Sequence, residues 1–176
     1  MSGIIRFISD PHFGHKNMAI RRGFNDSYCH DENFVFQWNN VVNKGDTTWI
    51  LGDITMEKNN YAILDRLLGN KRVVLGNHDM GNHAKTLVHH VNSIHGMVNL
   101  RTKEYGSIFI THCPIHPSEL DYRVKLNIHG HVHENSIIMQ CNNPELPKRL
   151  DKRYINVSAE VLDYVPKTLK QLINND

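Results

Sequence analysis

The chain has 176 residues, 40% of them hydrophobic, which suits a single domain over residues 1–176 with one ordinary core. Its formal net charge of +2 falls short of the strongly basic balance of a dedicated nucleic-acid binder, so nucleic acid is expected only as a substrate. Its 3 cysteines lack C-x-x-C spacing, which argues against a disulfide framework, and no apolar run reaches membrane-spanning length. We therefore expect a cytoplasmic protein without a membrane partner.

The first half of the chain alternates apolar runs with helical patterns. The runs at residues 4–9, 48–51 and 73–75 predict buried strands. Between the first two runs, apolar residues recur with helical spacing over residues 32–42, ahead of a glycine that can end the helix. Residues 61–68 show the same spacing before the third run. The order strand, helix, strand, helix, strand predicts an α/β arrangement with parallel strands.

The second half is richer in strand patterns. Residues 84–91 predict a short helix, and residues 97–101 with 107–111 predict a hairpin that turns through a polar, glycine-containing segment. Further strands are expected at residues 124–128, 136–140 and 154–157. Periodicity therefore indicates an α/β chain that becomes strand-rich toward its carboxyl end.

Side chains that can bind metals or move protons follow several of these strands. Histidine, the commonest metal ligand, is unusually frequent at 13 residues. One such motif alone is more often a turn or a cap than a ligand. In open α/β sheets, however, ligands bind beyond the carboxyl ends of the strands, so the joint occurrence predicts one site with several ligands. The motifs are Asp10-Pro11-His12, Gly52-Asp53, Gly76-Asn77-His78-Asp79, His112 and His129-Gly130-His131-Val132-His133.

The spacing within these motifs gives a first prediction of their geometry. In an extended strand end, residues i and i+2 face the same side. Asp10 and His12 are therefore expected to bind one ion together, and so are His131 and His133. Gly76 is expected to permit the turn that follows its strand.

The ordered set of motifs, each after an apolar run, closely resembles the signature of the calcineurin-like metallophosphoesterases. The resemblance extends from Asp10 to His133 and is closest to the short, single-domain members of phages and bacteria. It implies an αββα sandwich of two mixed β-sheets flanked by helices, a more specific fold than periodicity supports.

The resemblance also implies a dinuclear metal site. It assigns Asp10, His12, Asp53 and His133 to one ion, and Asp53, Asn77, His112 and His131 to the other, so that Asp53 bridges the two. A carboxylate has two oxygens to share, and an amide oxygen and neutral imidazoles add ligands without charge. Oxygen and nitrogen ligands without a thiolate favour Mn²⁺, with Fe, Ni²⁺ or Zn²⁺ as alternatives.

The implied activity is phosphoester hydrolysis by a metal-bridging hydroxide. His78 would protonate or stabilise the leaving oxygen, and Asp79 would orient the His78 imidazole and raise its pKa. Two divalent ions, two carboxylates and one hydroxide leave a net charge of about +1, which suits an anionic substrate.

The expected substrate is a phosphodiester such as a nucleotide, a cyclic nucleotide or an oligonucleotide end. A phosphomonoester is the alternative for the same site. A non-catalytic, protein-binding scaffold of the same fold is a further alternative, but such a scaffold would be expected to lack motif residues that are all present here. The physiological substrate, the native metals and the oligomeric state stay open at this stage.

Other candidates near the motifs have weaker support. Lys16, Arg21 and Arg22 follow the first motif and could contact a phosphate or a base, although a solvated basic loop explains them equally well. Cys113 is expected to be a small buried thiol. Surface or structural roles are expected for His30, His83, His89, His90, His95 and His129.

Overall fold

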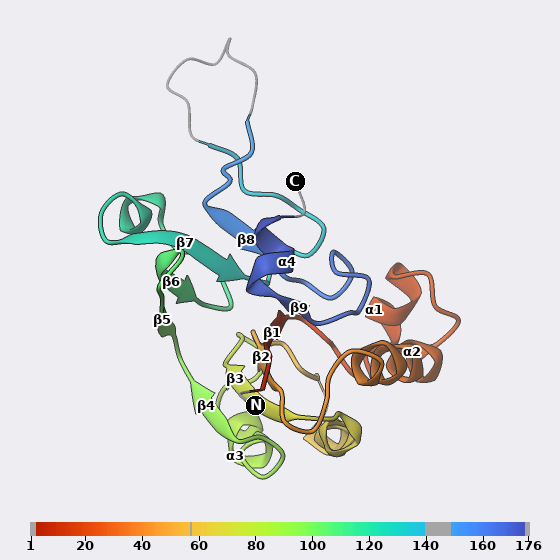
Figure 1. Cartoon of the computed structure of the whole chain (residues 1–176). Coiled ribbons are helices and arrows are strands. Elements are labelled where there is room, and N and C mark those ends of the chain that lie inside the picture. Colours follow the sequence, from red (N-terminus) through yellow and green to blue (C-terminus); the bar gives the residue numbers. More distant parts are fainter. Residues whose placement is uncertain (1–2, 57, 140–148, 175–176) are drawn as a thin grey trace.

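The computed structural model describes residues 3–56, 58–139 and 149–174. The first of its two sheets has five strands. Its strand order is β4-β3-β2-β1-β9, with parallel pairing from β1 to β4 and antiparallel pairing between β1 and β9 (Figure 1). The strands are β1 (Ile5–Ile8), β2 (Thr47–Ile50), β3 (Asn70–Val74), β4 (Ser93–His95) and β9 (Lys167–Thr168).

The second sheet has the order β5-β6-β7-β8, in which β5 and β6 form the predicted antiparallel hairpin and the other pairs are parallel. Its strands are β5 (Val98–Thr102), β6 (Gly106–Ile110), β7 (Val124–His129) and β8 (Tyr154–Asn156). Ile108, Ile110 and Ile128 of this sheet are fully buried in the same core as Phe7 and Ile8 of the first sheet. The two sheets therefore share one hydrophobic core.

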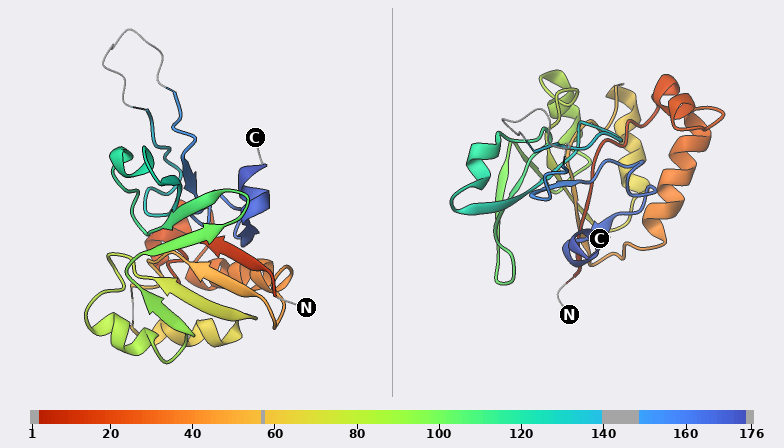
Figure 2. Two further views of the ribbon diagram at one scale, coloured as in Figure 1. Left: turned by 60° about the vertical axis from the view of Figure 1, so that its left-hand side comes forward. Right: turned by 90° about the horizontal axis from the view of Figure 1, so that it is seen from above.

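Helices lie outside the two sheets. In the right-hand view of Figure 2, α2 and η1 lie on one side of the first sheet and the second sheet lies on the other, with η2 at its far edge. The prediction of two mixed β-sheets flanked by helices is confirmed. The helices are α1 (Lys16–Arg21), α2 (Ser27–Asn39), the 3₁₀ helix η1 (Lys58–Arg66), α3 (Asn82–Leu87), the 3₁₀ helix η2 (Pro117–Leu120) and α4 (Leu169–Ile173).

The helix α2 begins earlier than its apolar spacing predicts. The side chain of Asp26 accepts a hydrogen bond from the backbone N–H of Cys29, so the helix is capped within a polar segment that has no apolar period. Its apolar face nevertheless packs as expected, because Phe34 and Trp38 are fully buried, and the Trp38 indole N–H donates to the carbonyl of Leu68 at 2.9 Å.

Several boundaries differ from the predictions. The helix expected at residues 61–68 is η1, and that expected at 84–91 is the shorter α3. No strand forms over the described part of the predicted segment 136–140, where only Ile138 pairs, with Leu150; residue 140 lies outside the described residues. Among the described residues, no helix has the length and apolar character needed to cross a membrane.

Candidate metal centre

The predicted ligands meet at one edge of the structure, beyond the carboxyl ends of strands from both sheets. The parallel register of β1 with β2, and of β2 with β3, aligns the strand ends that precede Asp10, Asp53 and Asn77. The second sheet adds His112 after β6. It also adds His131 after β7. The backbone N–H of His131 donates to the Asp10 carboxylate at 2.9 Å. That hydrogen bond joins the two sheets at the site.

The first cluster consists of Asp10, His12 and His133, whose ligand atoms all lie within 4.8 Å of one another. The Nε2 atom of His12 is 3.9 Å from Asp10 Oδ1 and 4.0 Å from Asp53 Oδ2. The rings of His12 and His133 stack with centroids 5.4 Å apart. These distances leave room for one cation among the four side chains.

The second cluster surrounds the ring of His112. Its Nε2 atom lies 3.0 Å from Asn77 Oδ1, 3.1 Å from His131 Nδ1 and 3.4 Å from Asp53 Oδ1. The other nitrogen, Nδ1, donates to the carbonyl of Leu51 at 2.7 Å, which leaves Nε2 as the lone-pair nitrogen of the neutral ring. Several electron-pair donors therefore converge on one point, and a cation there would satisfy all of them.

Three ligand atoms of the first cluster have no hydrogen-bond partner among the described residues. Asp10 Oδ1 and both ring nitrogens of His12 are buried without a hydrogen bond. A buried polar atom of this kind costs free energy unless something binds it. Burial raises the pKa of Asp10, while burial and the nearby Arg22 guanidinium lower the pKa of His12 to about 3, which keeps this ring neutral. The donor set therefore fits a divalent ion.

The charges of the second cluster are coupled through Asp53. Burial of the His112 ring disfavours its charged form, but the hydrogen bond to Asp53 and the carboxylates of Asp10 and Asp53 raise its pKa. Burial likewise opposes ionisation of Asp53, yet the His112 ring and the backbone N–H of His78 lower the pKa of Asp53 to about 2. Asp53 is thus the carboxylate that favours a cation beside His112.

The backbone at the site is left-handed at most of the predicted ligands. Asp10, His12, Asp53, His131 and His133 all have φ between 51° and 69°. The two ligands in D-x-H and in H-x-H therefore do not sit on extended strand ends, and the expectation based on i, i+2 alternation is wrong. Asp10 and His12 still share a cluster, whereas His133 joins them and His131 joins His112.

Two glycines allow close approach at the centre. A Cβ atom on Gly76 would lie 2.2 Å from Asp53 Oδ1, and one on Gly130 would lie 2.2 Å from Asp10 Oδ2. Gly76 does not have a positive φ, unlike Gly52. The chain nevertheless turns at Gly76 as expected, since the Gly76 carbonyl accepts from the Asp79 N–H at 3.2 Å, and the missing Cβ atom makes room there for the Asp53 carboxylate.

Asp79 does not have the surroundings that the sequence led us to expect. Its carboxylate is buried and accepts three backbone N–H groups, from Asp53 at 2.7 Å, Gly76 at 2.9 Å and Ile54 at 3.0 Å. No hydrogen bond joins Asp79 to the His78 imidazole in the part of the chain that the structure describes. The expected role for Asp79 is thus corrected, because its acceptor oxygens hold the loops after β2 and β3 together.

His78 lies at the open side of the centre. Its backbone N–H donates to Asp53 Oδ1 at 3.1 Å, which fixes the residue next to the shared carboxylate. Its Nε2 atom is 3.9 Å from Asp53 Oδ2, and its side chain is 39% exposed. The imidazole can therefore reach both the centre and a molecule arriving from solvent.

Glu160 is a site residue that the motifs do not reveal. Its carboxylate accepts a hydrogen bond from His133 Nδ1 at 2.7 Å and pairs with the guanidinium of Arg22. Burial opposes its ionisation, but the hydrogen bond from His133 and the charge of Arg22 lower the pKa of Glu160 to about 2. A carboxylate in this position orients a ligating imidazole and fixes its tautomer. Nothing in the local sequence marks Glu160, because its partners lie far away along the chain.

Comparison with known proteins places the chain among uncharacterised relatives. It is 31% identical to the gene 66 protein of Mycobacterium phage L5, over 88% of this chain and 85% of that protein. It is also 31% identical to the uncharacterized protein MJ1445 of Methanocaldococcus jannaschii, over 96% of this chain and 89% of that protein. The chain belongs to the gene 66 protein family. No model of a known protein family matches its sequence.

One solved structure shares the fold of this gene 66 family member. The protein of unknown function AQ665 from Aquifex aeolicus superimposes with a TM-score of 0.73 and 25% identity, over 99% of this chain and 100% of that chain. A conserved uncharacterized protein from Streptococcus pneumoniae TIGR4, described as a predicted phosphoesterase, gives a TM-score of only 0.40 at 13% identity, over 89% and 71% of the two chains. That second similarity is too weak to bear on fold or function.

The two arginines after the first motif have different surroundings in this family member. The side chain of Arg22 is only 3% exposed and donates to the carbonyls of Asp10 and Pro11. It therefore holds the backbone of the first motif at the candidate metal centre, and the expectation that it could contact a phosphate is wrong. Arg21 is 58% exposed and pairs with Glu134, next to His133.

The exposure of Cys113 also differs from the expectation. The residue is exposed and its thiol is free, so the expectation of a buried thiol is wrong. Partial desolvation of this exposed residue, and then the negative charges of Asp53 and Asp10, raise the pKa of the thiol. The structural roles expected for His30 and His129 agree with their burial, since His30 bonds Asp31 and His129 bonds the carbonyl of Gly130.

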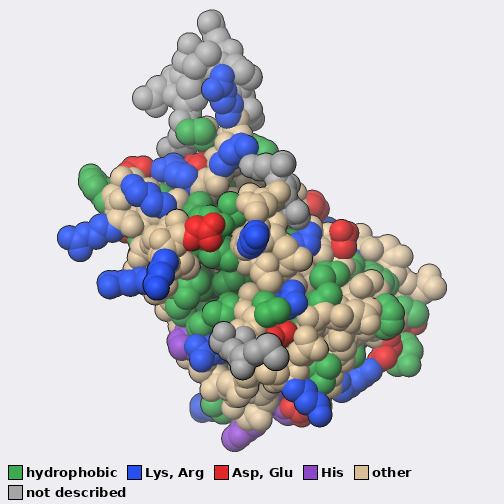
Figure 3. Space-filling model, in the orientation of Figure 1, with side chains coloured by type: hydrophobic (Ala, Val, Ile, Leu, Met, Phe, Trp, Pro, Cys, Tyr) green, Lys and Arg blue, Asp and Glu red, His purple; other side chains and the backbone are tan. Residues whose placement is uncertain are grey.

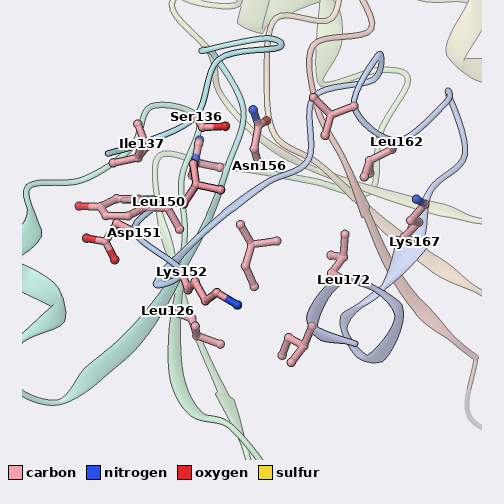
Figure 4. Close-up of a pocket in the computed structure, with 15 residues that line it drawn as sticks. Leu126, Ser136, Ile137, Leu150, Asp151, Lys152, Asn156, Leu162, Lys167 and Leu172 are labelled. Atoms are coloured by element: carbon pink, nitrogen blue, oxygen red, sulfur yellow. The ribbon is translucent and has the colours of Figure 1, made fainter. Parts of the chain in front are cut away.

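A separate cleft of about 460 Å³, lined by both apolar and polar side chains, lies between the second sheet and α4. Figure 4 shows Leu126, Leu162 and Leu172 directed into it, with Lys152 and Lys167 near its rim. Figure 3 shows hydrophobic side chains gathered on this face of the molecule, bordered by Lys and Arg. None of the candidate metal-centre residues lines the cleft, so it is distinct from that site.

Proposed function

We propose that this protein is a metal-dependent phosphoester hydrolase with a dinuclear centre. The observation that supports this most strongly is the convergence of carboxylates, an amide oxygen and imidazoles around buried ligand atoms that have no other partner. Such an arrangement is costly for folding unless cations bind there, so it is best explained by function.

The donor set divides naturally between two ions. Asp10, His12, Asp53 and His133 would hold one, and Asp53, Asn77, His112 and His131 would hold the other, with two Mn²⁺ as the expected occupants. When bound, two divalent ions supply Lewis acidity toward phosphoryl oxygens and lower the pKa of a water nucleophile. The carboxylates of Asp10 and Asp53 neutralise only part of that charge, so the loaded site attracts an anionic phosphate.

The remaining roles follow from position. His78 is half exposed beside Asp53 and would donate a proton to the leaving oxygen of a bound phosphoester. Asp79 would act as a positioning residue, since it bonds the backbone N–H groups of Asp53 and Gly76. Glu160 would orient His133 and maintain its lone pair toward the ion.

We further propose that the substrate is a phosphodiester, such as a nucleotide, a cyclic nucleotide or an oligonucleotide end. Asn77 and His131 are exposed, so the centre is open enough to admit a phosphate that carries two substituents. A diester places a single negative charge at the centre, and the exposed Arg21, which pairs with Glu134 next to His133 in the sequence, would contact the second substituent.

The test is steady-state kinetics of Mn²⁺-reconstituted protein on matched nitrophenyl mono- and diesters, cyclic nucleotides and short oligonucleotides. We expect metal-dependent turnover and a higher kcat/KM for the diester. A monoester preference of about tenfold would overturn the diester assignment and leave the hydrolase standing. Metal binding without turnover of any substrate would instead support a non-catalytic scaffold.

A further inference from the structure

The exposed thiol of Cys113 lies at the metal centre. Its sulfur and a ring nitrogen of each of His112 and His131 are all within 4.8 Å of one another. The side chain of Thr111 donates to the Cys113 carbonyl at 2.7 Å, which fixes the turn that carries the thiol beyond His112. This cysteine is therefore part of a group of potential ligands.

A second observation shows that this group borders a cation position. His112 also belongs to a group with Asp10 and Asp53, whose ligand atoms lie within 4.8 Å of one another. In that group Asp10 Oδ1 is fully buried and has no hydrogen-bond partner. The thiol therefore belongs to the convergence of electron-pair donors at His112, whose Nε2 atom lies 3.0 Å from Asn77 Oδ1 and 3.1 Å from His131 Nδ1.

We propose that Cys113 is an additional ligand of the ion held by Asn77, His112 and His131, and that it makes this position selective for thiophilic Zn²⁺ over Mn²⁺. This inference rests on the proposed dinuclear centre and refines its metal preference. Oxygen and nitrogen ligands alone would favour Mn²⁺ at both positions, whereas a soft thiolate favours Zn²⁺. The two positions would then differ, because the first cluster contains no cysteine.

The binding step is balanced without any redox partner. The thiol loses its proton to solvent, and the sulfur lone pair forms the bond to the divalent ion. Binding of the ion at this one position thus releases one proton, and the thiolate lowers the net charge of the site by one.

The experiment is a Co²⁺ titration of the metal-free full-length protein, followed by absorbance. Visible d–d bands report Co²⁺ binding, and a near-ultraviolet thiolate-to-cobalt band reports a bond to sulfur. Cys29 is an exposed free cysteine whose backbone N–H donates to the Asp26 carboxylate, so Cys29→Ser is the matched control. Cys113→Ser and Cys113→Ala test the proposal, with alanine excluding a substitute oxygen ligand.

We expect the thiolate band in the wild type and in Cys29→Ser and its loss in both Cys113 variants. The preference for Zn²⁺ over Mn²⁺ should fall about tenfold or more in these variants, as for loss of one metal-site contact. Visible bands without a thiolate band in the wild type would overturn the Cys113 assignment alone. A wild type that binds no Co²⁺ would overturn the dinuclear centre itself and this inference with it.

Discussion

Replacing Asp79 by asparagine tests what this buried carboxylate does. Its Oδ2 atom accepts from the N–H groups of Asp53 and Gly76, and its Oδ1 atom accepts from Ile54. In Asp79→Asn one oxygen becomes an amide NH₂ group, which faces an N–H donor and leaves it unsatisfied. Since a hydrogen bond to a charged acceptor contributes about 1.5–3 kcal/mol, we expect the free energy of unfolding to fall by about this amount.

The same substitution should loosen the metal centre, because Asp79 anchors the loops that carry Asp53 and Asn77. We expect metal affinity to fall by about 10 to 100-fold. Urea denaturation of the metal-free protein and competition with a chelator measure the two effects. His78→Asn is the control, and it should preserve both stability and affinity. If Asp79→Asn stays as stable as wild type, keeps its metals and only shifts the pH profile of kcat, then Asp79 acts on His78 and our correction is wrong.

Other substitutions test the remaining assignments. His78→Asn should slow turnover by roughly 10² to 10⁴ with metal content unchanged, and by less for a nitrophenol leaving group; an emptied centre would refute the proton-donor role. Asp53→Asn should weaken both ions by about tenfold or more in metal analysis, and retention of two tight ions would exclude bridging. Backbone N–H groups of Asn43 and Ile4 lower the pKa of Asp46. The Asp46 carboxylate therefore stabilises the fold above the ordinary pKa of aspartate, and this stabilisation is lost as the pH falls below that value. Asp46→Asn should therefore lower the free energy of unfolding by about 1–3 kcal/mol at pH 7, with a difference that shrinks below about pH 4; a difference that is independent of pH would contradict this.

The elements that the sequence predicts well are those with a long apolar period. The strands β1, β2 and β3 and the helix α2 bury several side chains each, so their apolar residues form a pattern that is recognisable in the sequence. The helix α4 was missed because it has only 5 residues, too few to show a period. It is held instead by a capping box between Thr168 and Gln171.

The site shows a similar division between local and tertiary information. Motifs identify the residues that gather at the centre, because a ligand must be a particular residue type. They do not identify Glu160, which contacts His133 across 27 residues of chain and Arg22 across 138. Nor do they show that Asp79 accepts from backbone N–H groups and not from the imidazole of His78, because those N–H groups are present at every residue and cannot be recognised in the sequence. Packing decides both cases.

The left-handed backbone at the candidate ligands affects how substitutions there should be read. Aspartate, asparagine and histidine tolerate this conformation better than other residues with a Cβ atom, and the penalty for the others is about 1–2 kcal/mol. Alanine scanning of Asp10, His12 or Asp53 would therefore combine the loss of a ligand with a backbone penalty that has nothing to do with metal. Glycine would err in the opposite direction, since it would relax the backbone and stabilise the metal-free chain. Asparagine keeps the conformation while removing the charge or the imidazole, so an asparagine scan separates the chemistry of these residues from their geometry.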